Sequence, residues 1–212
     1  MHTDGKWLSF GTWTVFLVVT IIAIIICIRW LDIPVALQFH SQAGRYSPLG
    51  QGFSSSILVT GELALIMSLS IARIIRGSLS EYARTLFMAC CSSLFAFEAN
   101  DRILKVIFGR QNPAAFFDKP ALHLFHFLQG NEHSSFPSGH MVMATAFAVV
   151  IIRLHPRTAP PLIALLCLGA FALLVGDWHF ASDIVAGAFE GWTAGLMAAE
   201  LWDQHIRRHG LQ

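Results

Sequence analysis

The chain has 212 residues, of which 55% are hydrophobic and only 13% are charged. A soluble domain carries about 25% charged residues, so this composition excludes an ordinary soluble core and predicts a helical integral membrane protein. The net charge of +1 argues against a nucleic-acid partner, because a surface that binds nucleic acid needs a clear excess of basic residues. The expected partner is therefore the lipid bilayer.

Six apolar stretches are candidates to cross a bilayer, whose core of about 30 Å takes roughly 20 helical residues. In chain order they cover residues 7–28, 45–73, 84–109 (with a charged second half), 139–153, 158–176 and 184 to about 202. We therefore expect residues 1–212 to form a single all-α domain, a bundle of six transmembrane helices. Lysine and arginine in short connections mark the cytoplasmic side, which places the third and fifth connections together on the outward face.

Three polar clusters stand at the outward ends of the third, fourth and sixth expected spans. The first is a charged stripe whose spacing places its members on one helix face, namely Glu98, Asp101, Arg102 and Lys105. Such a stripe can face a polar cavity, or it can neutralise itself through i,i+4 pairs between Glu98 and Arg102 and between Asp101 and Lys105. Arg110 follows the stripe.

The second and third clusters open the fourth and sixth spans. Pro137 and the pair Ser138–Gly139 begin a helix whose first N–H groups lack partners and can bind anions, and His140 stands in its first turn. Asp183 lies four residues after His179, so its carboxylate can bond one ring nitrogen and leave the other free as a nucleophile. Each histidine alone is more often structural, but together with the basic residues they indicate a functional site.

These residues resemble the three motifs of the type-2 phosphatidic-acid phosphatase superfamily, which also contains vanadium haloperoxidases and bacterial acid phosphatases. The resemblance rests on Lys105–Arg110, on Pro137–His140 and on His179 with Asp183, all within about residues 100–190. It implies a phosphatase that acts on a membrane lipid phosphate or pyrophosphate. It also implies a reaction without a metal or another cofactor.

The resemblance further implies a role for each residue. His179 would be the nucleophile that forms a phosphohistidine, Asp183 would orient it, and His140 would protonate the leaving oxygen and then activate water. The phosphoryl oxygens would be held by Lys105, Arg110, Ser138 and Gly139. Such a site would face the periplasm or outside of a bacterial inner (plasma) membrane, at the outward ends of the third, fourth and sixth spans.

The chain departs from the family pattern at two phosphate-binding arginines. Asn112 stands before Pro113 where the family has an arginine, and Ala172–Leu173 stands where it has Ser-Arg. Loss of one such donor costs about 3–4 kcal/mol of transition-state stabilisation, so two uncompensated losses would nearly abolish activity. The nearest substitutes are Arg102, Trp178 and Asn112 itself.

Several alternatives stay open at the level of sequence. The phosphoryl group could pass to another lipid or sugar, which would make a lipid phosphotransferase, or the fold could serve a non-catalytic lipid-binding or transport protein. The candidate substrates are phosphatidic acid, phosphatidylglycerol phosphate, polyprenyl pyrophosphate and a lipid A phosphate. The sequence does not indicate an oligomeric state.

Three further features carry weaker expectations. Residues 120–128 predict a short amphipathic helix on the membrane surface. The spacing of His123, His126 and His133 can suit a metal, although the sequence fixes no complete ligand set, so no metal is expected. Glu190 is expected to bond to a neighbouring helix, for instance through Glu62.

Overall fold

The computed structural model describes residues 10–43, 55–118, 124–130 and 134–209. Within these ranges the chain is all-helical, and its only extended pairings are two isolated bridges, Arg110 with Phe125 and Gln111 with Ser134. The all-α class expected from the sequence is therefore confirmed for the described residues.

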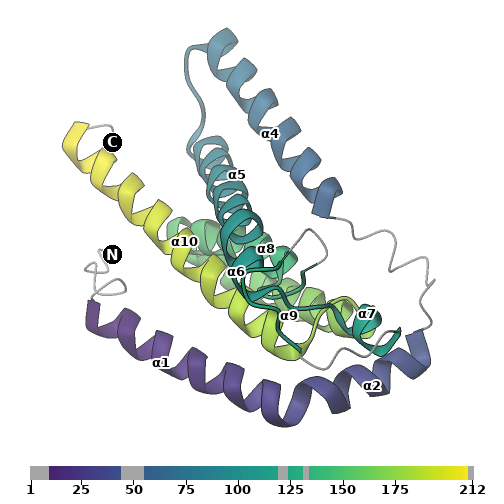
Figure 1. Ribbon diagram of the computed structural model, residues 1–212. Helices are drawn as coiled ribbons and strands as arrows, with labels where there is room; N and C mark the ends of the chain where they lie inside the picture. Colours follow the sequence, from purple (N-terminus) through teal and green to yellow (C-terminus); the bar gives the residue numbers. More distant parts are fainter. Residues whose placement is uncertain (1–9, 44–54, 119–123, 131–133, 210–212) are drawn as a thin grey trace.

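Long helices occupy each of the six expected stretches (Figure 1). Two of them contain a π-helical turn, η2 or η3, and η4 is a short 3-10 turn. The elements in chain order are α1 (Phe10–Ile26), η2 (Cys27–Leu31), α2 (Asp32–Ala43), α4 (Ser55–Arg76), α5 (Glu81–Ala99), η3 (Asn100–Leu104), α6 (Lys105–Phe108), α7 (Pro113–Asp118), α8 (Gly139–Leu154), η4 (Pro156–Thr158), α9 (Ala159–Val175) and α10 (Ala181–His209).

Three helical segments within the described residues are long and apolar enough to cross a membrane: Phe10–His40, Ser55–Arg76 and Pro156–Val175. The helices of the third, fourth and sixth expected spans are shorter or more polar, since α8 has 16 residues and both α5 and α10 carry charges. These apolar helices identify a membrane protein, and the count of six spans stays a prediction.

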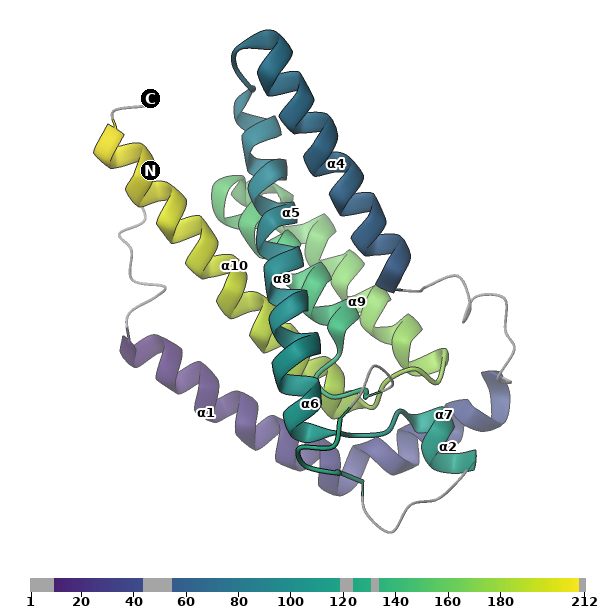
Figure 2. The same cartoon turned by 45° about the horizontal axis from the view of Figure 1, so that its top comes forward.

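The first helix extends further than the sequence indicated. We expected it to end near Arg29, but it continues through the π-helical turn η2 into α2. A π-type insertion is a common cause of a helix kink, and in Figures 1 and 2 α2 bends away from the axis of α1. The bend brings α2 against α7 and α9.

Helix α8 lies in the centre and packs against α5, α9 and α10. Its contact with α10 is close because Gly187, Gly191 and Gly195 form a stripe at four-residue spacing on the facing side. A Cβ atom at any of the three would lie closer than 3 Å to a backbone carbonyl oxygen of α8 or of its N-cap Ser138. Small residues at this spacing let two helix backbones approach, as they do in many membrane helix pairs.

The prediction of an amphipathic helix at residues 120–128 is wrong for the described part of that range. Residues 124–128 are not helical, because their backbone bonds to the end of α6 instead: the Leu128 N–H donates to the Ile107 carbonyl over 2.8 Å, and the His126 N–H to Gly109 over 3.2 Å. Residues 120–123 lie outside the described residues. The short helix of this connection is α7.

Candidate active site

Residues of two connections that are distant in sequence, 112 and 134–135 in one and 178–179 in the other, line one small polar cavity of about 210 Å³. A cavity below about 300 Å³ is smaller than a drug-sized ligand needs, so this one suits a phosphate group rather than a whole lipid. Its lining comes from four helices and both connections, and consists of Ser55, Phe97, Lys105, Asn112, Ser134, Ser135, Gly139, His140, Trp178 and His179.

The start of α8 forms one wall of this cavity, as the Pro-Ser-Gly-His sequence predicted. Ser138 is the N-cap, and its hydroxyl oxygen accepts the Met141 N–H at 3.4 Å. The Ser138 N–H donates to the Asp183 backbone carbonyl over 3.0 Å, which ties α8 to the first turn of α10. Ser138 is therefore fully buried as a cap, whereas Gly139 lines the cavity.

Lys105 reaches the cavity from η3 and α6. Its Nζ atom lies 3.7 Å from the position that a Cβ on Gly139 would take, so the ammonium group and the first turn of α8 converge. The side chain is only 11% exposed, and Nζ donates to Asp101 Oδ1 over 2.8 Å. A cation and a helix N-terminus side by side favour an anionic ligand.

The two candidate histidines face each other across the cavity. The ring centroids of His140 and His179 are 5.8 Å apart, and the indole of Trp178 packs edge-on to His140 at 5.7 Å. His179 Nδ1 lies 3.5 Å from Asp183 Oδ2. That distance exceeds the 2.7–3.2 Å of a normal hydrogen bond by a few tenths of an ångström, so a small ring movement would let Asp183 orient His179.

The carboxylate of Asp183 is fully buried and held by several donors. Its Oδ2 atom accepts the Ser135 hydroxyl at 2.7 Å and the Phe180 N–H at 2.9 Å, and its Oδ1 atom accepts Arg110 Nη1 at 2.5 Å. Burial by itself raises the pKa of Asp183, but Arg110, His179 and Ser135 stabilise the charged form, and together they hold its pKa below the ordinary value.

Arg110 does not line the cavity, although the resemblance placed it on a phosphoryl oxygen. It is fully buried behind Asp183, and its guanidinium lies between the rings of Phe125 and Phe180, 4.9 and 4.2 Å from their centroids. Its Nη2 atom also pairs with Asp32 Oδ2 at 2.7 Å. Two buried carboxylates draw the guanidinium inward, away from the space open to a substrate.

The charged stripe at the end of α5 is divided by the π-helical turn η3. Both expected i,i+4 pairs form, since Arg102 Nε lies 2.5 Å from Glu98 Oε2 and Lys105 pairs with Asp101. The Arg102 side chain is 78% exposed and outside the cavity, whereas Lys105 is turned into it. Of the proposed substitutes for the missing arginines, only Asn112 and Trp178 line the cavity.

The residues that stand where the family has arginines make other contacts here. Asn112 uses its Oδ1 atom to accept the Ala115 N–H at 2.8 Å, which caps α7. Leu173 is buried and packs with Met141 and Ile184. The position that carries an arginine in the family thus belongs to an apolar contact between α8, α9 and α10.

Sequence reasoning missed two residues of α2 and the serine pair before Phe136. Asp32 bonds to Arg110 and to Ser182, and His40 Nδ1 lies 2.6 Å from Asp177 Oδ2. The signal for Asp32 was a lone acid directly after the first apolar stretch. Ser134 and Ser135 could have been found from their position next to the Pro-Ser-Gly-His sequence.

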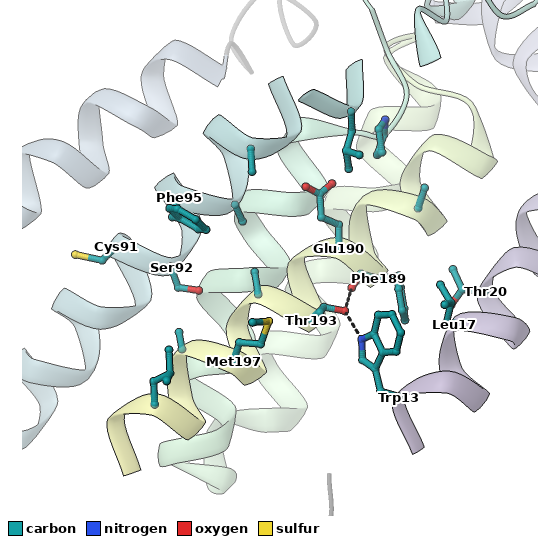
Figure 3. Close-up of a pocket in the computed structure, with 18 of the residues that line it drawn as sticks. Trp13, Leu17, Thr20, Cys91, Ser92, Phe95, Phe189, Glu190, Thr193 and Met197 are labelled. Carbon is teal, nitrogen blue, oxygen red and sulfur yellow. Dashed lines mark hydrogen bonds between the residues drawn. The ribbon is translucent and has the colours of Figure 1, made fainter. Parts of the chain in front are cut away.

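A larger apolar cavity of about 980 Å³ lies between α1, α5 and α10 (Figure 3). It uses a different side of α5 from the polar cavity, because Ala96 and Ala99 line the large cavity and Phe97 lines the small one. Across its wall the Trp13 indole N–H donates to Thr193 Oγ1 over 3.3 Å. This lining suits hydrocarbon rather than phosphate.

Two half-buried acids of the bundle, Glu62 and Glu190, each bond to a side chain of a neighbouring helical element. Glu190, which lines the apolar cavity, accepts Asn100 Nδ2 at 2.7 Å, while Glu62 accepts the Ser93 hydroxyl at 2.8 Å. The expected bond of Glu190 to a neighbouring helix is therefore confirmed, but its partner is Asn100 of η3 and not Glu62. In the described part of the chain no group of three or more His, Cys, Asp or Glu side chains is placed to hold a metal ion; His123 and His133 lie outside that part.

Comparison with known proteins agrees with the motifs. The profile of the PAP2 superfamily matches residues 83–207. A protein of Rhizobium johnstonii named Lipid A 1-phosphatase is 28% identical over 213 residues, which cover 92% of this chain and 86% of the relative. A protein of Rhizobium etli with the same name is 37% identical over 98 residues, or 45% of this chain and 42% of the relative. No solved structure matches the chain.

Proposed function

The chain belongs to the PAP2 superfamily, and we propose that it is a membrane phosphatase that removes a phosphate group from lipid A or a chemically similar lipid. The family match and the relatives' names identify it as a phosphoric monoester hydrolase. Lipid A is the first candidate substrate because the R. johnstonii protein named Lipid A 1-phosphatase aligns with this chain along most of both sequences.

The observation that carries this proposal is the convergence of two histidines, a lysine and a helix start on one small cavity. His140, His179, Lys105 and Gly139 come from different parts of the sequence, and all line the same 210 Å³ space. Phosphoryl transfer requires mainly the positioning of the phosphate and the compensation of its spread negative charge. A purely structural cluster would not need an ammonium group beside a helix N-terminus.

In the proposed reaction His179 attacks phosphorus with Nε2, the ring nitrogen that does not face Asp183. The bond from phosphorus to the lipid oxygen breaks, and His140 donates its proton to that oxygen. A water then attacks the phosphohistidine while His140 accepts its proton, so inorganic phosphate leaves and both histidines return to their starting states. Lys105 and the Gly139 N–H balance charge on the phosphoryl oxygens.

Arg110 and Ser138 take indirect roles in this proposal. Arg110 holds the carboxylate of Asp183 from behind, and Ser138 fixes the first turn of α8 so that Gly139 and His140 face the cavity. The hydrocarbon chains of the lipid stay outside the polar cavity, in contact with apolar helix surface. We further propose six membrane spans, with the cavity on the periplasmic side of the inner membrane.

The test is phosphate release by the purified protein in detergent, measured on a panel of lipid A 1-phosphate, phosphatidic acid, phosphatidylglycerol phosphate and a polyprenyl pyrophosphate. We expect release from lipid A to be fastest, with the same reaction lost in His179→Ala. Preference for another lipid would correct the substrate. Failure to release phosphate from any member of the panel would overturn the proposal.

A further inference from the structure

A cluster of three buried charges lies directly behind His179. It consists of Asp32, Arg110 and Asp183, which are exposed by 1%, 0% and 0%. The guanidinium of Arg110 bridges the two carboxylates, with Nη2 at 2.7 Å from Asp32 and Nη1 at 2.5 Å from Asp183. With two acids and one base, the cluster carries one net negative charge when all three are ionised.

Asp32 reaches this cluster from outside the part of the chain that matches the family. That match begins at residue 83, whereas Asp32 is the first residue of α2. Its Oδ1 atom accepts the Ser182 N–H at 2.9 Å, and its Oδ2 atom accepts the Ser182 hydroxyl at 2.5 Å. Asp32 thus holds both Arg110 and the first turn of α10, the turn that also carries Asp183.

Asp32, the second acid of the cluster, affects how well Asp183 can balance a positive charge on His179. A guanidinium paired with Asp183 alone would cancel the charge of that carboxylate in a site that excludes water, where such pairs interact strongly. Asp32 neutralises Arg110 from its other side, so Asp183 keeps a net negative charge toward the histidine. A positive charge develops on the ring of His179 when it bonds to phosphorus, and this carboxylate can balance it.

The other charged and titratable groups around His179 do not supply that balance. Lys105 and His140 lie across the cavity, and neither is an anion. Asp177, two residues before His179, is engaged by His40 of α2 at 2.6 Å. The negative charge next to the nucleophile therefore comes from the Asp32, Arg110 and Asp183 cluster.

We propose that Asp32 is a positioning residue for the reaction: it orients and neutralises Arg110 so that Asp183 can balance the charge formed on His179. The inference rests on the proposed function. It assigns to the N-terminal helix an electrostatic task in a site whose recognised motifs all lie beyond residue 100.

The experiment compares Asp32→Asn, Arg110→Gln and the double variant Asp32→Asn/Arg110→Gln in the phosphate-release assay. Asp32→Asn keeps the shape of the side chain but leaves the cluster neutral, so we expect kcat to fall by at least about tenfold. KM should change by less than about twofold, because Asp32 contacts no atom of the cavity. The double variant restores one net negative charge and should recover much of the lost kcat.

The matched control is Asp203→Asn, which removes a half-buried acid that pairs with Arg153 at 3.9 Å and should leave both constants unchanged. If Asp32 had a structural role alone, the double variant would be slower than Asp32→Asn, because it also lacks the hydrogen bonds of the guanidinium; that result would overturn the inference. So would an unchanged kcat in Asp32→Asn.

Folding of each variant is checked by circular dichroism and size-exclusion chromatography. If Asp32→Asn does not fold, the double variant decides: it should fold and keep kcat within about tenfold of the parent, and a folded but inactive double variant would refute the inference. Absence of phosphate release from the unmodified chain would instead overturn the proposed function, and the role of Asp32 with it.

Discussion

Substitution of Gly187 by alanine should impair the site without changing any side chain that lines the cavity. A Cβ atom on Gly187 would lie 2.5 Å from the Ser138 carbonyl oxygen, whereas ordinary contact begins at 3.4 Å. The start of α8 must therefore move by about 0.9 Å, the difference of these distances, away from α10. Overpacking of this kind costs about 1–3 kcal/mol of stability, and the movement also separates His140 from His179.

The rate should respond more strongly than the stability does. Misplacement of reacting groups by about 1 Å can cost about 10²-fold in rate, so kcat of Gly187→Ala should fall by about that factor while the protein still folds. The assay is phosphate release from lipid A in detergent, with a thermal melt of the same sample. Gly169→Ala is the control, since nothing lies within 4 Å of its Cβ position in α9. A Gly187→Ala enzyme within about twofold of the parent would refute the packing argument.

Three other predictions follow from the proposed chemistry and topology. His179→Ala should abolish turnover on every substrate. His140→Ala should lower the rate by about 10²–10⁴-fold on a lipid phosphate and by far less on nitrophenyl phosphate, whose leaving group needs little protonation. Equal losses of rate on both substrates in His140→Ala would contradict these roles. Hydrolysis should survive excess chelator and be inhibited by orthovanadate, and recovery of a chelator-sensitive activity by a divalent ion would point to a metal mechanism. In a cysteine-free background, Gln129→Cys should react with an impermeant thiol reagent in intact spheroplasts and Arg157→Cys should not; the reverse pattern would contradict the six-span topology.

The parts of the site that sequence could predict are those set by local rules. Pro137, Ser138 and Gly139 predicted a helix start, and α8 begins at Gly139 with Ser138 as its cap. The four-residue spacing of His179 and Asp183 placed them within 3.5 Å of each other. The family resemblance built on these motifs is confirmed by the profile match. The chemical roles of these residues stay predictions.

The other features of the site depend on contacts between residues distant in sequence and on irregular helical turns, which local rules do not predict. Arg110 and Asp32 are 78 residues apart in sequence, and no local spacing rule connects an acid at the end of one helix with an arginine in a later loop. The π-helical turn η3 also makes a long-range contact, because its first residue, Asn100, donates to Glu190 of α10. The i,i+4 spacing alone does not distinguish Lys105, which lines the cavity, from Arg102, which lies outside it; the family resemblance assigns Lys105 to the phosphoryl oxygens and leaves Arg102 as a possible substitute.

Without the two arginines of the family pattern, fewer cations can compensate the charge of the phosphoryl group. Leu173 occupies one of those positions and is buried against Met141 and Ile184, so the apolar contact that it makes leaves no room for a cation aimed at phosphate. Among the residues that the structure describes, Lys105 is the one lysine or arginine that lines the cavity. In the proposed reaction, compensation of the phosphoryl charge would then fall on Lys105 and on the first turn of α8. Because the first turn of α8 packs against α10 and bonds to its first turn, we expect the glycine stripe and the buried cluster at Asp32 to affect the rate through the motif residues that they hold in place.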